Sequence, residues 1–180
     1  MKSVSPNTKR VAFGGLMLAL ALVLSFIEQQ FPVLPFLPPG VKLGLSNIIC
    51  MYALFSVGLS MALSISVAKA LFVFLMRGLT AGALSLGGGL LSLLGMFFLN
   101  LLFRKSNLSY MFLSISGGVL HNLGQYFLVV IISAIPFFSL YLAALIFFGA
   151  LMGTLTGLIF SLVYPAMEKI NPKKQGEKLP

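Results

Sequence analysis

LGLSNIICMYALFSVGLSMALSISVAKALFVFLM, residues 43–76, is an unbroken apolar stretch of 34 residues with one charged side chain, Lys69. A helix that crosses a bilayer needs about 20 mainly apolar residues. The stretch is therefore too long for one ordinary span and has the right length for two, packed against each other by a tight turn near Gly58-Leu59-Ser60. We predict membrane helices over residues 44–57 and 61–76 on either side of that turn.

The rest of the chain has the same character. Of its 180 residues 59% are hydrophobic and 8% charged, and the mean hydropathy is +1.06, which is outside the range of soluble domains. We predict an all-α membrane protein with a single domain, residues 1–180, folded as a bundle of six transmembrane helices. The predicted spans are residues 11–27, 44–57, 61–76, 81–103, 108–133 and 139–164, followed by a basic tail over residues 166–180.

The basic residues predict the orientation. If both termini are cytoplasmic, that side holds nine basic residues against Lys42 and Arg77 outside, as the positive-inside rule requires. The nine are Lys2, Lys9, Arg10, Arg104, Lys105, Lys169, Lys173, Lys174 and Lys178. This orientation puts Glu28, a proline-rich segment over residues 31–40 and the outer half of the third span, with Lys69, on the extracytoplasmic side.

Lys69 is the most informative single residue, because an ionised side chain at membrane depth costs roughly 2.5–3.5 kcal/mol on insertion scales and marks a functional site by default. Ala62 and Ser66 share its helical face, which suits a surface directed into the bundle. Two interpretations are open. Lys69 either extends to the interface or pairs with Glu28, or it offers a positive charge to an anionic ligand.

Other polar and small residues also have two interpretations. His121 shares one helical face with Gly117, Gly124 and Gln125, so it either bonds neighbouring helices or contacts a ligand. The triplet over residues 87–89 serves close helix packing or marks a locally unwound helix whose backbone lines a cavity. Gly15 and Ala19 form a small-residue face on the first span, suited to contact with another helix.

The absent motifs exclude several classes of function. The sequence contains no P-loop, no paired carboxylates, no Cys or His cluster and no Asp. Carboxylates that could hold Mg²⁺ against a diphosphate are therefore missing, as is any machinery for ATP hydrolysis by this chain alone. We predict a protein that is not an enzyme, with no cofactor and no metal site. Despite the net charge of +9 we expect no nucleic-acid partner, because the charge follows the positive-inside pattern.

Several motifs together resemble one bacterial membrane family. They are the stretch Pro39-Gly-Val-Lys-Leu-Gly-Leu-Ser-Asn-Ile, Lys69-Ala, Arg77-Gly-Leu-Thr, Ser85-Leu-Gly-Gly-Gly and Ser116-Gly-Gly-Val-Leu-His-Asn-Leu-Gly-Gln. The family is called heptaprenyl diphosphate synthase component I, or the Gx transporter family. It is similar in turn to the substrate-binding S components of energy-coupling factor (ECF) vitamin transporters.

That resemblance implies six helices, a substrate site near the outer face under the first loop, and docking on a coupling subunit with two ATPases. It also implies a small-residue docking face on the first helix, which Gly15 and Ala19 could match. The location implied is the cytoplasmic membrane of a bacterial cell.

We therefore predict an S-component-like subunit that binds a small, anionic organic compound, with a vitamin-, flavin- or isoprenoid-like body held by Phe- and Leu-rich walls. The predicted site residues are Lys42, Lys69, Arg77, His121, Asn122 and Gln125. Two alternatives remain open: a membrane accessory subunit of heptaprenyl diphosphate synthase in isoprenoid quinone biosynthesis, and a membrane anchor in a redox complex.

Overall fold

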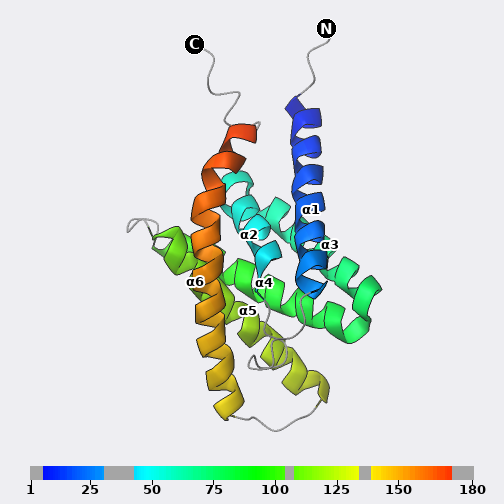
Figure 1. Cartoon of the computed structure of the whole chain (residues 1–180), viewed down its shortest axis with the longest axis vertical. Helices are drawn as coiled ribbons and strands as arrows, with labels where there is room; N and C mark the ends of the chain where they lie inside the picture. The colour runs from blue at the N-terminus through cyan, green and yellow to red at the C-terminus, as the bar shows by residue number, and fades with distance from the viewer. Residues whose placement is uncertain (1–5, 31–42, 104–107, 134–138, 172–180) are drawn as a thin grey trace.

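The computed structural model describes residues 6–30, 43–103, 108–133 and 139–171, which fold as a bundle of helices (Figure 1). The prediction of an all-α fold with six helices is confirmed. The helices are α1 (Pro6–Gln30), α2 (Leu45–Tyr52) with a π-helical turn η1 (Ala53–Val57), α3 (Leu59–Arg77), α4 (Leu79–Leu102), α5 (Tyr110–Ser133) and α6 (Ser139–Ile170).

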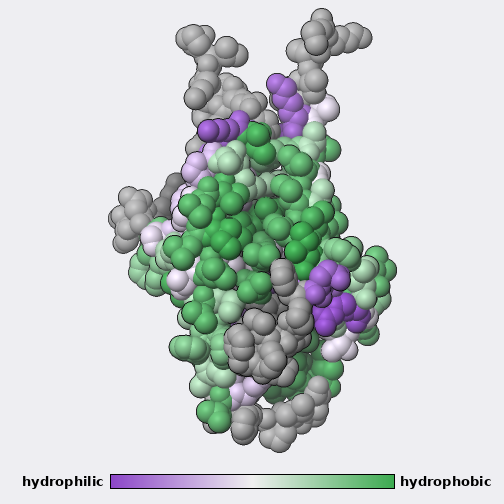
Figure 2. Space-filling model, in the orientation of Figure 1, coloured by the Kyte–Doolittle hydropathy of each residue, from purple (hydrophilic) through white to green (hydrophobic). Residues whose placement is uncertain are grey.

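Five of these helices, all except α2, are long and apolar enough to cross a bilayer. Their outward faces carry many exposed hydrophobic side chains, such as Leu75 and Leu162, which are 78% and 81% exposed. Figure 2 shows this apolar surface as a broad belt, with hydrophilic patches where α1 begins and α6 ends and another beside the far end of α1. The chain is a multi-pass membrane protein.

Helix α2 differs from the predicted full span. Helix α2 has 8 residues and η1 has 5. Joined end to end they form about 20 Å of helix, whereas the hydrocarbon core is about 30 Å thick. The helix begins after Gly44 and η1 ends before Gly58, and these two glycines have positive φ angles of 79° and 138°. Most of its residues are buried, and it lies between α1 and α6 (Figure 1). It is an interior helix whose first turn starts inside the molecule.

Glycines allow the helices on either side of α5 to approach it closely. A Cβ atom on Gly88 would lie 2.8 Å from the backbone oxygen of His121, and one on Gly124 would lie 2.7 Å from that of Gly87. Helix α4 is continuous through residues 87–89. Of the two interpretations of that glycine triplet, the structure supports close packing and not an unwound helix.

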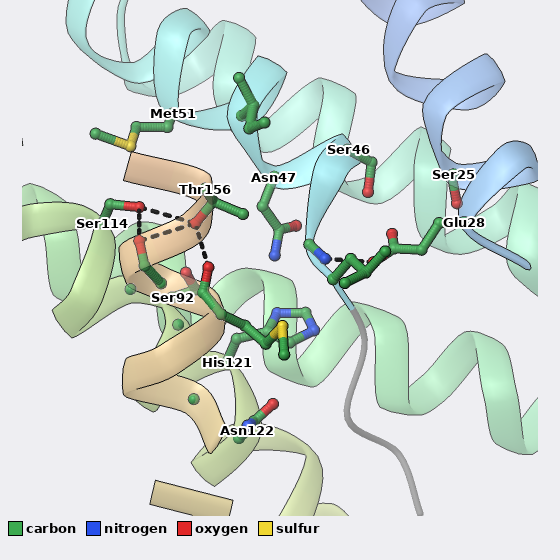
Figure 3. Close-up of a pocket in the computed structure, with 18 of the residues that line it drawn as sticks. Ser25, Glu28, Ser46, Asn47, Met51, Ser92, Ser114, His121, Asn122 and Thr156 are labelled. Atoms are coloured by element: carbon green, nitrogen blue, oxygen red, sulfur yellow. Dashed lines mark hydrogen bonds between the residues drawn. The ribbon is translucent and has the colours of Figure 1, made fainter. Parts of the chain in front are cut away.

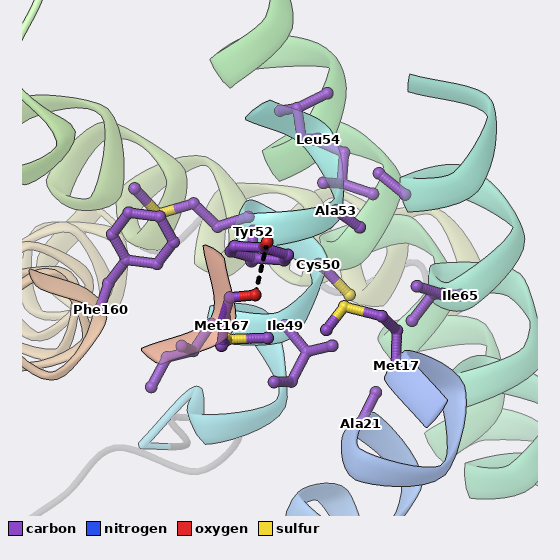
Figure 4. Close-up of a cluster of buried hydrophobic side chains, with 14 of the residues drawn as sticks. Met17, Ala21, Ile49, Cys50, Tyr52, Ala53, Leu54, Ile65, Phe160 and Met167 are labelled. Atoms are coloured by element: carbon purple, nitrogen blue, oxygen red, sulfur yellow. Dashed lines mark hydrogen bonds between the residues drawn. The ribbon is translucent and has the colours of Figure 1, made fainter. Parts of the chain in front are cut away.

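The buried core joins α1, α2, α3, α4 and α6 around Tyr52, which is completely buried (Figure 4). The Tyr52 hydroxyl donates to the Met167 carbonyl over 3.1 Å and accepts from the Asn171 amide over 3.2 Å. These bonds fix the last turns of α6, which continues past Pro165 to Ile170. The predicted span ended at residue 164, because a proline removes a helical hydrogen bond; the contacts with Tyr52 stabilise the turn beyond it.

Candidate functional site

All six α-helices contribute side chains to one buried, polar cavity inside the bundle (Figure 3). It lies where α1 ends and α2 begins. Its volume is about 50 Å³, which is room for a few water molecules. The polar residues that line it are Ser25, Glu28, Gln29, Ser46, Asn47, Lys69, Ser85, Ser92, Ser114, His121, Asn122 and Thr156.

Lys69 brings a positive charge to this cavity from α3. The side chain is only 3% exposed, and its Nζ atom donates to Asn47 Oδ1 over 2.7 Å. A buried charge is costly unless it is paired or hydrogen-bonded, and an ammonium group has three protons to donate. Lys69 therefore lies inside the bundle and lines the cavity, instead of extending to the membrane surface.

Glu28 holds the start of α2 from the other side. Its Oε1 atom accepts the backbone N–H of Gly44, the residue that precedes α2. Asn47, in the first turn of α2, is bonded to Lys69. Side chains from α1 and α3 with opposite charges thus fasten the same turn at the wall of the cavity, which explains why a short helix can begin there.

His121 and Asn122 reach the cavity from α5. The Gln125 amide lies 3.1 Å from His121 Nε2; with the amide as donor, the neutral ring carries its proton on Nδ1. The Asn122 amide donates to the Leu145 carbonyl of α6 over 2.9 Å. Both side chains are therefore held in defined orientations, as a preformed site requires.

Hydroxyl groups from α5 and α6 line another wall of the cavity. The Ser114 hydroxyl donates to the Gly153 carbonyl over 2.8 Å and lies 3.0 Å from the Thr156 hydroxyl, and Ser92 is near them in Figure 3. The sequence prediction missed these residues. Serine and threonine are common in membrane helices, where they bond to their own backbone, so only their convergence on one cavity distinguishes them.

The structure brings three of the six predicted site residues to the cavity. Lys69, His121 and Asn122 line the cavity. Gln125 is not among the lining residues and lies behind His121, whose ring it contacts. Arg77 ends α3, is exposed and does not line the cavity, so the structure does not bring it to Lys69. Lys42 lies outside the described residues.

The walls also differ from the predicted Phe- and Leu-rich ones. Among the described lining residues none is Phe, Tyr or Trp, and the apolar contacts come from Leu43, Ile48, Val73 and three methionines. The methionines are Met51, Met96 and Met152. Unbranched thioether side chains adapt to irregular spaces, so this wall can adjust to a ligand more easily than one built from packed rings.

The two residues predicted to dock a partner lie on the outside of α1. Gly15 and Ala19 are both exposed. A Cβ atom on Gly15 would meet nothing within 4 Å, whereas one on the neighbouring Gly14 would touch Met61 of α3. The Gly15 side of α1 is therefore a small-residue surface that the described part of the chain leaves uncovered.

The fold and cavity define a class: helical membrane proteins of the S-component fold. A solved structure described as "Structure and mechanism of the S component of a bacterial ECF transporter" superimposes with a TM-score of 0.68. The match covers 91% of this chain and 97% of that one, at 20% sequence identity.

Residues 17–163 match the family model of heptaprenyl diphosphate synthase component I, and the chain belongs to that family. No curated protein matches the chain. The sequence motifs resembled this family and, through it, the S components of ECF transporters. The family and the similarity of fold are both confirmed.

Proposed function

We propose that this chain is the substrate-capture subunit of an ECF-type importer for a small, anionic organic compound. The single observation that carries the proposal is the Lys69 ammonium, buried at a cavity to which all six α-helices contribute. The S-component fold supports it, because the solved protein with this fold is the S component of such a transporter.

The polar groups of the cavity indicate which class of substrate it would bind. Lys69 would neutralise a carboxylate or phosphate, and His121, Asn122 and the Ser114–Thr156 pair would bond to its polar body. The hydroxyls and amides that line the cavity favour a substrate with several hydrogen-bonding groups. Adaptable methionines at the wall would accept the substrate's carbon skeleton.

The energy for transport would come from partner proteins. The sequence has no nucleotide-binding motif, so we propose a transmembrane coupling subunit and two ATPases. The uncovered face of α1 with Gly15 and Ala19 would contact the coupling subunit, since small residues let helix backbones approach. In the proposed orientation both termini are cytoplasmic, and the cavity opens toward the extracytoplasmic side of a bacterial cytoplasmic membrane.

The family description favours one alternative function. It names a component of heptaprenyl diphosphate synthase, so the chain could serve as a non-catalytic membrane subunit that anchors or feeds a soluble synthase. The chain itself lacks the acidic residues that would hold a metal–diphosphate complex, and we propose that it is not an enzyme in either role.

Co-purification in mild detergent distinguishes the two functions. We expect the tagged chain to retain a membrane coupling subunit and ATPases; recovery of a prenyl synthase without them would favour the alternative. Gly15→Phe with Ala19→Phe should abolish the association by blocking close approach. Leu71→Phe, on a residue of α3 that is 58% exposed, is the control, and an equal loss in this variant would contradict docking through α1.

A further inference from the structure

A second cavity lies at the other end of α1. Arg10 and Phe13 line it from α1, Ser56 from η1, Ser60 from α3, and Asn171 from the residue after α6. Its volume is about 350 Å³. Arg10 and Glu28 are 18 positions apart on the same helix, which corresponds to about 27 Å along its axis. The two cavities therefore open near opposite surfaces of the hydrocarbon layer, and this one has no role in the proposed capture of substrate.

The polar groups of this cavity are suited to an anion. Arg10 is exposed and carries a guanidinium group, whose planar set of donors matches the oxygens of a phosphate. The Ser56 hydroxyl oxygen is buried at this cavity and forms no hydrogen bond of good geometry within the described part of the chain; the Tyr52 hydroxyl is its polar neighbour. A buried hydroxyl that is poorly bonded is unfavourable, and a ligand in this cavity would offer it a better acceptor.

The start of α3 adds further donors. No side chain caps this helix, and its first backbone bond runs from the Ala62 N–H to the Gly58 carbonyl. The preceding N–H groups of the first turn have no acceptor within the helix, and they point toward its positive end. Ser60, in that turn, lines the cavity. Glu168, the acidic residue at this end within the described chain, does not line it.

The apolar part of the cavity indicates where the anion comes from. Phe13, Val57 and Met61 line it beside the polar groups, and Val11 on the adjoining surface of α1 is 74% exposed. A free phosphate ion would gain nothing from these residues, whereas the glycerol backbone and first methylenes of a lipid would pack on them. Basic pockets between membrane helices are known to bind anionic headgroups.

We propose that the cavity formed by Arg10, Ser56 and the first turn of α3 binds the phosphate of an anionic phospholipid. The guanidinium would form charge-assisted bonds with the phosphate oxygens, and the Ser56 hydroxyl and the N–H groups of α3 would complete the shell.

Native mass spectrometry of the delipidated full chain, titrated with phosphatidylglycerol, tests the proposal. Arg10→Gln should reduce lipid retention about tenfold, because it removes the charged donor. Lys9→Gln is the matched control: it removes the same charge from the adjacent exposed residue, which does not line the cavity. We expect it to bind like the wild type, and equal retention by the two variants would overturn the site.

Two further measurements complete the test. Ser56→Ala should weaken binding without changing the net charge, so it remains informative if Arg10→Gln does not fold; unchanged binding would overturn the proposed contact. Inorganic phosphate at millimolar concentration should not displace the lipid. If it does so efficiently, the cavity binds free phosphate and the lipid assignment is wrong.

Discussion

At the scale of single residues, Lys69 and Asn47 form the contact on which the cavity depends. The ammonium group donates to the Asn47 side chain over 2.7 Å at a position that is 3% exposed. Removing one partner of a buried, charged hydrogen bond leaves the other unsatisfied, which costs more than the bond contributed. The pair should therefore behave as a unit.

Asn47→Leu should lower the thermal midpoint of the detergent-purified protein, with a loss of about 1–3 kcal/mol from the unsatisfied ammonium. The double variant with Lys69→Met should recover much of that loss, because both polar partners are then replaced by apolar side chains. Asn100→Leu is the control, since Asn100 is exposed on α4. Additive effects of the two substitutions would contradict the pairing.

The sequence identifies a site residue when that residue type is rare in its surroundings. A lysine in an apolar run is rare enough to mark a site, and Lys69 lines the cavity. Arg77 looked similar in the sequence, but it ends its helix and is exposed, where a basic residue is favourable next to the helix C-terminus. Sequence alone does not distinguish these two positions, because they differ in depth and direction.

At the scale of helices, the contact between α5 and α6 has almost no space for side chains. A Cβ atom on Gly118 would overlap the backbone oxygen of Gly149 and lie 3.0 Å from Gly153 Cα. Backbone atoms cannot rotate away as a flexible side chain can. The position of Asn122 and Ser114 at the cavity depends on this close approach, since both bond to backbone atoms of α6.

Gly118→Ala should therefore separate the two helices and destabilise the protein by about 1–3 kcal/mol or more, the usual cost of overpacking. Gly15→Ala is the matched control, because its Cβ atom meets nothing within 4 Å; it should be neutral or slightly stabilising. Thermal unfolding in one detergent compares the two. Similar midpoints for both variants would show that the glycine contact is less tight than the structure indicates.

Hydropathy predicted the long spans, but it did not predict that α2 is too short to cross the bilayer. Residues 44–57 are apolar enough to be assigned a span, and hydropathy does not show that a helix starts inside the bundle. The start of α2 depends on Glu28 and Lys69, which come from two other helices. The continuity of α6 through Pro165 depends in the same way on Tyr52, more than 100 residues earlier in the chain.

At the scale of the whole molecule, the bundle has two different ends. The polar cavity with Lys69 lies toward the end of α1, and the cavity with Arg10 lies toward its beginning. Helix α1 begins and α6 ends on the same side of the molecule (Figure 1). The basic residues of the sequence predict that this side is cytoplasmic.

Thiol labelling in intact cells tests that orientation. In a Cys50→Ala background, which removes the buried cysteine, a membrane-impermeant reagent should label Gln30→Cys and leave Lys9→Cys unlabelled until the cells are lysed. Both positions are exposed at opposite ends of α1. The reverse pattern would place the cavity around Lys69 on the cytoplasmic side and contradict the proposed direction of capture.

The most direct test of the central claim is the occupancy of the cavity around Lys69. Native mass spectrometry of the wild-type chain, purified in mild detergent from cells that express it, should show a bound small anion. Lys69→Met should lose it by about tenfold or more, because the charged donor is gone, while Lys9→Met should retain it. A Lys69→Met protein that is folded and carries the same small molecule at wild-type occupancy would contradict the account.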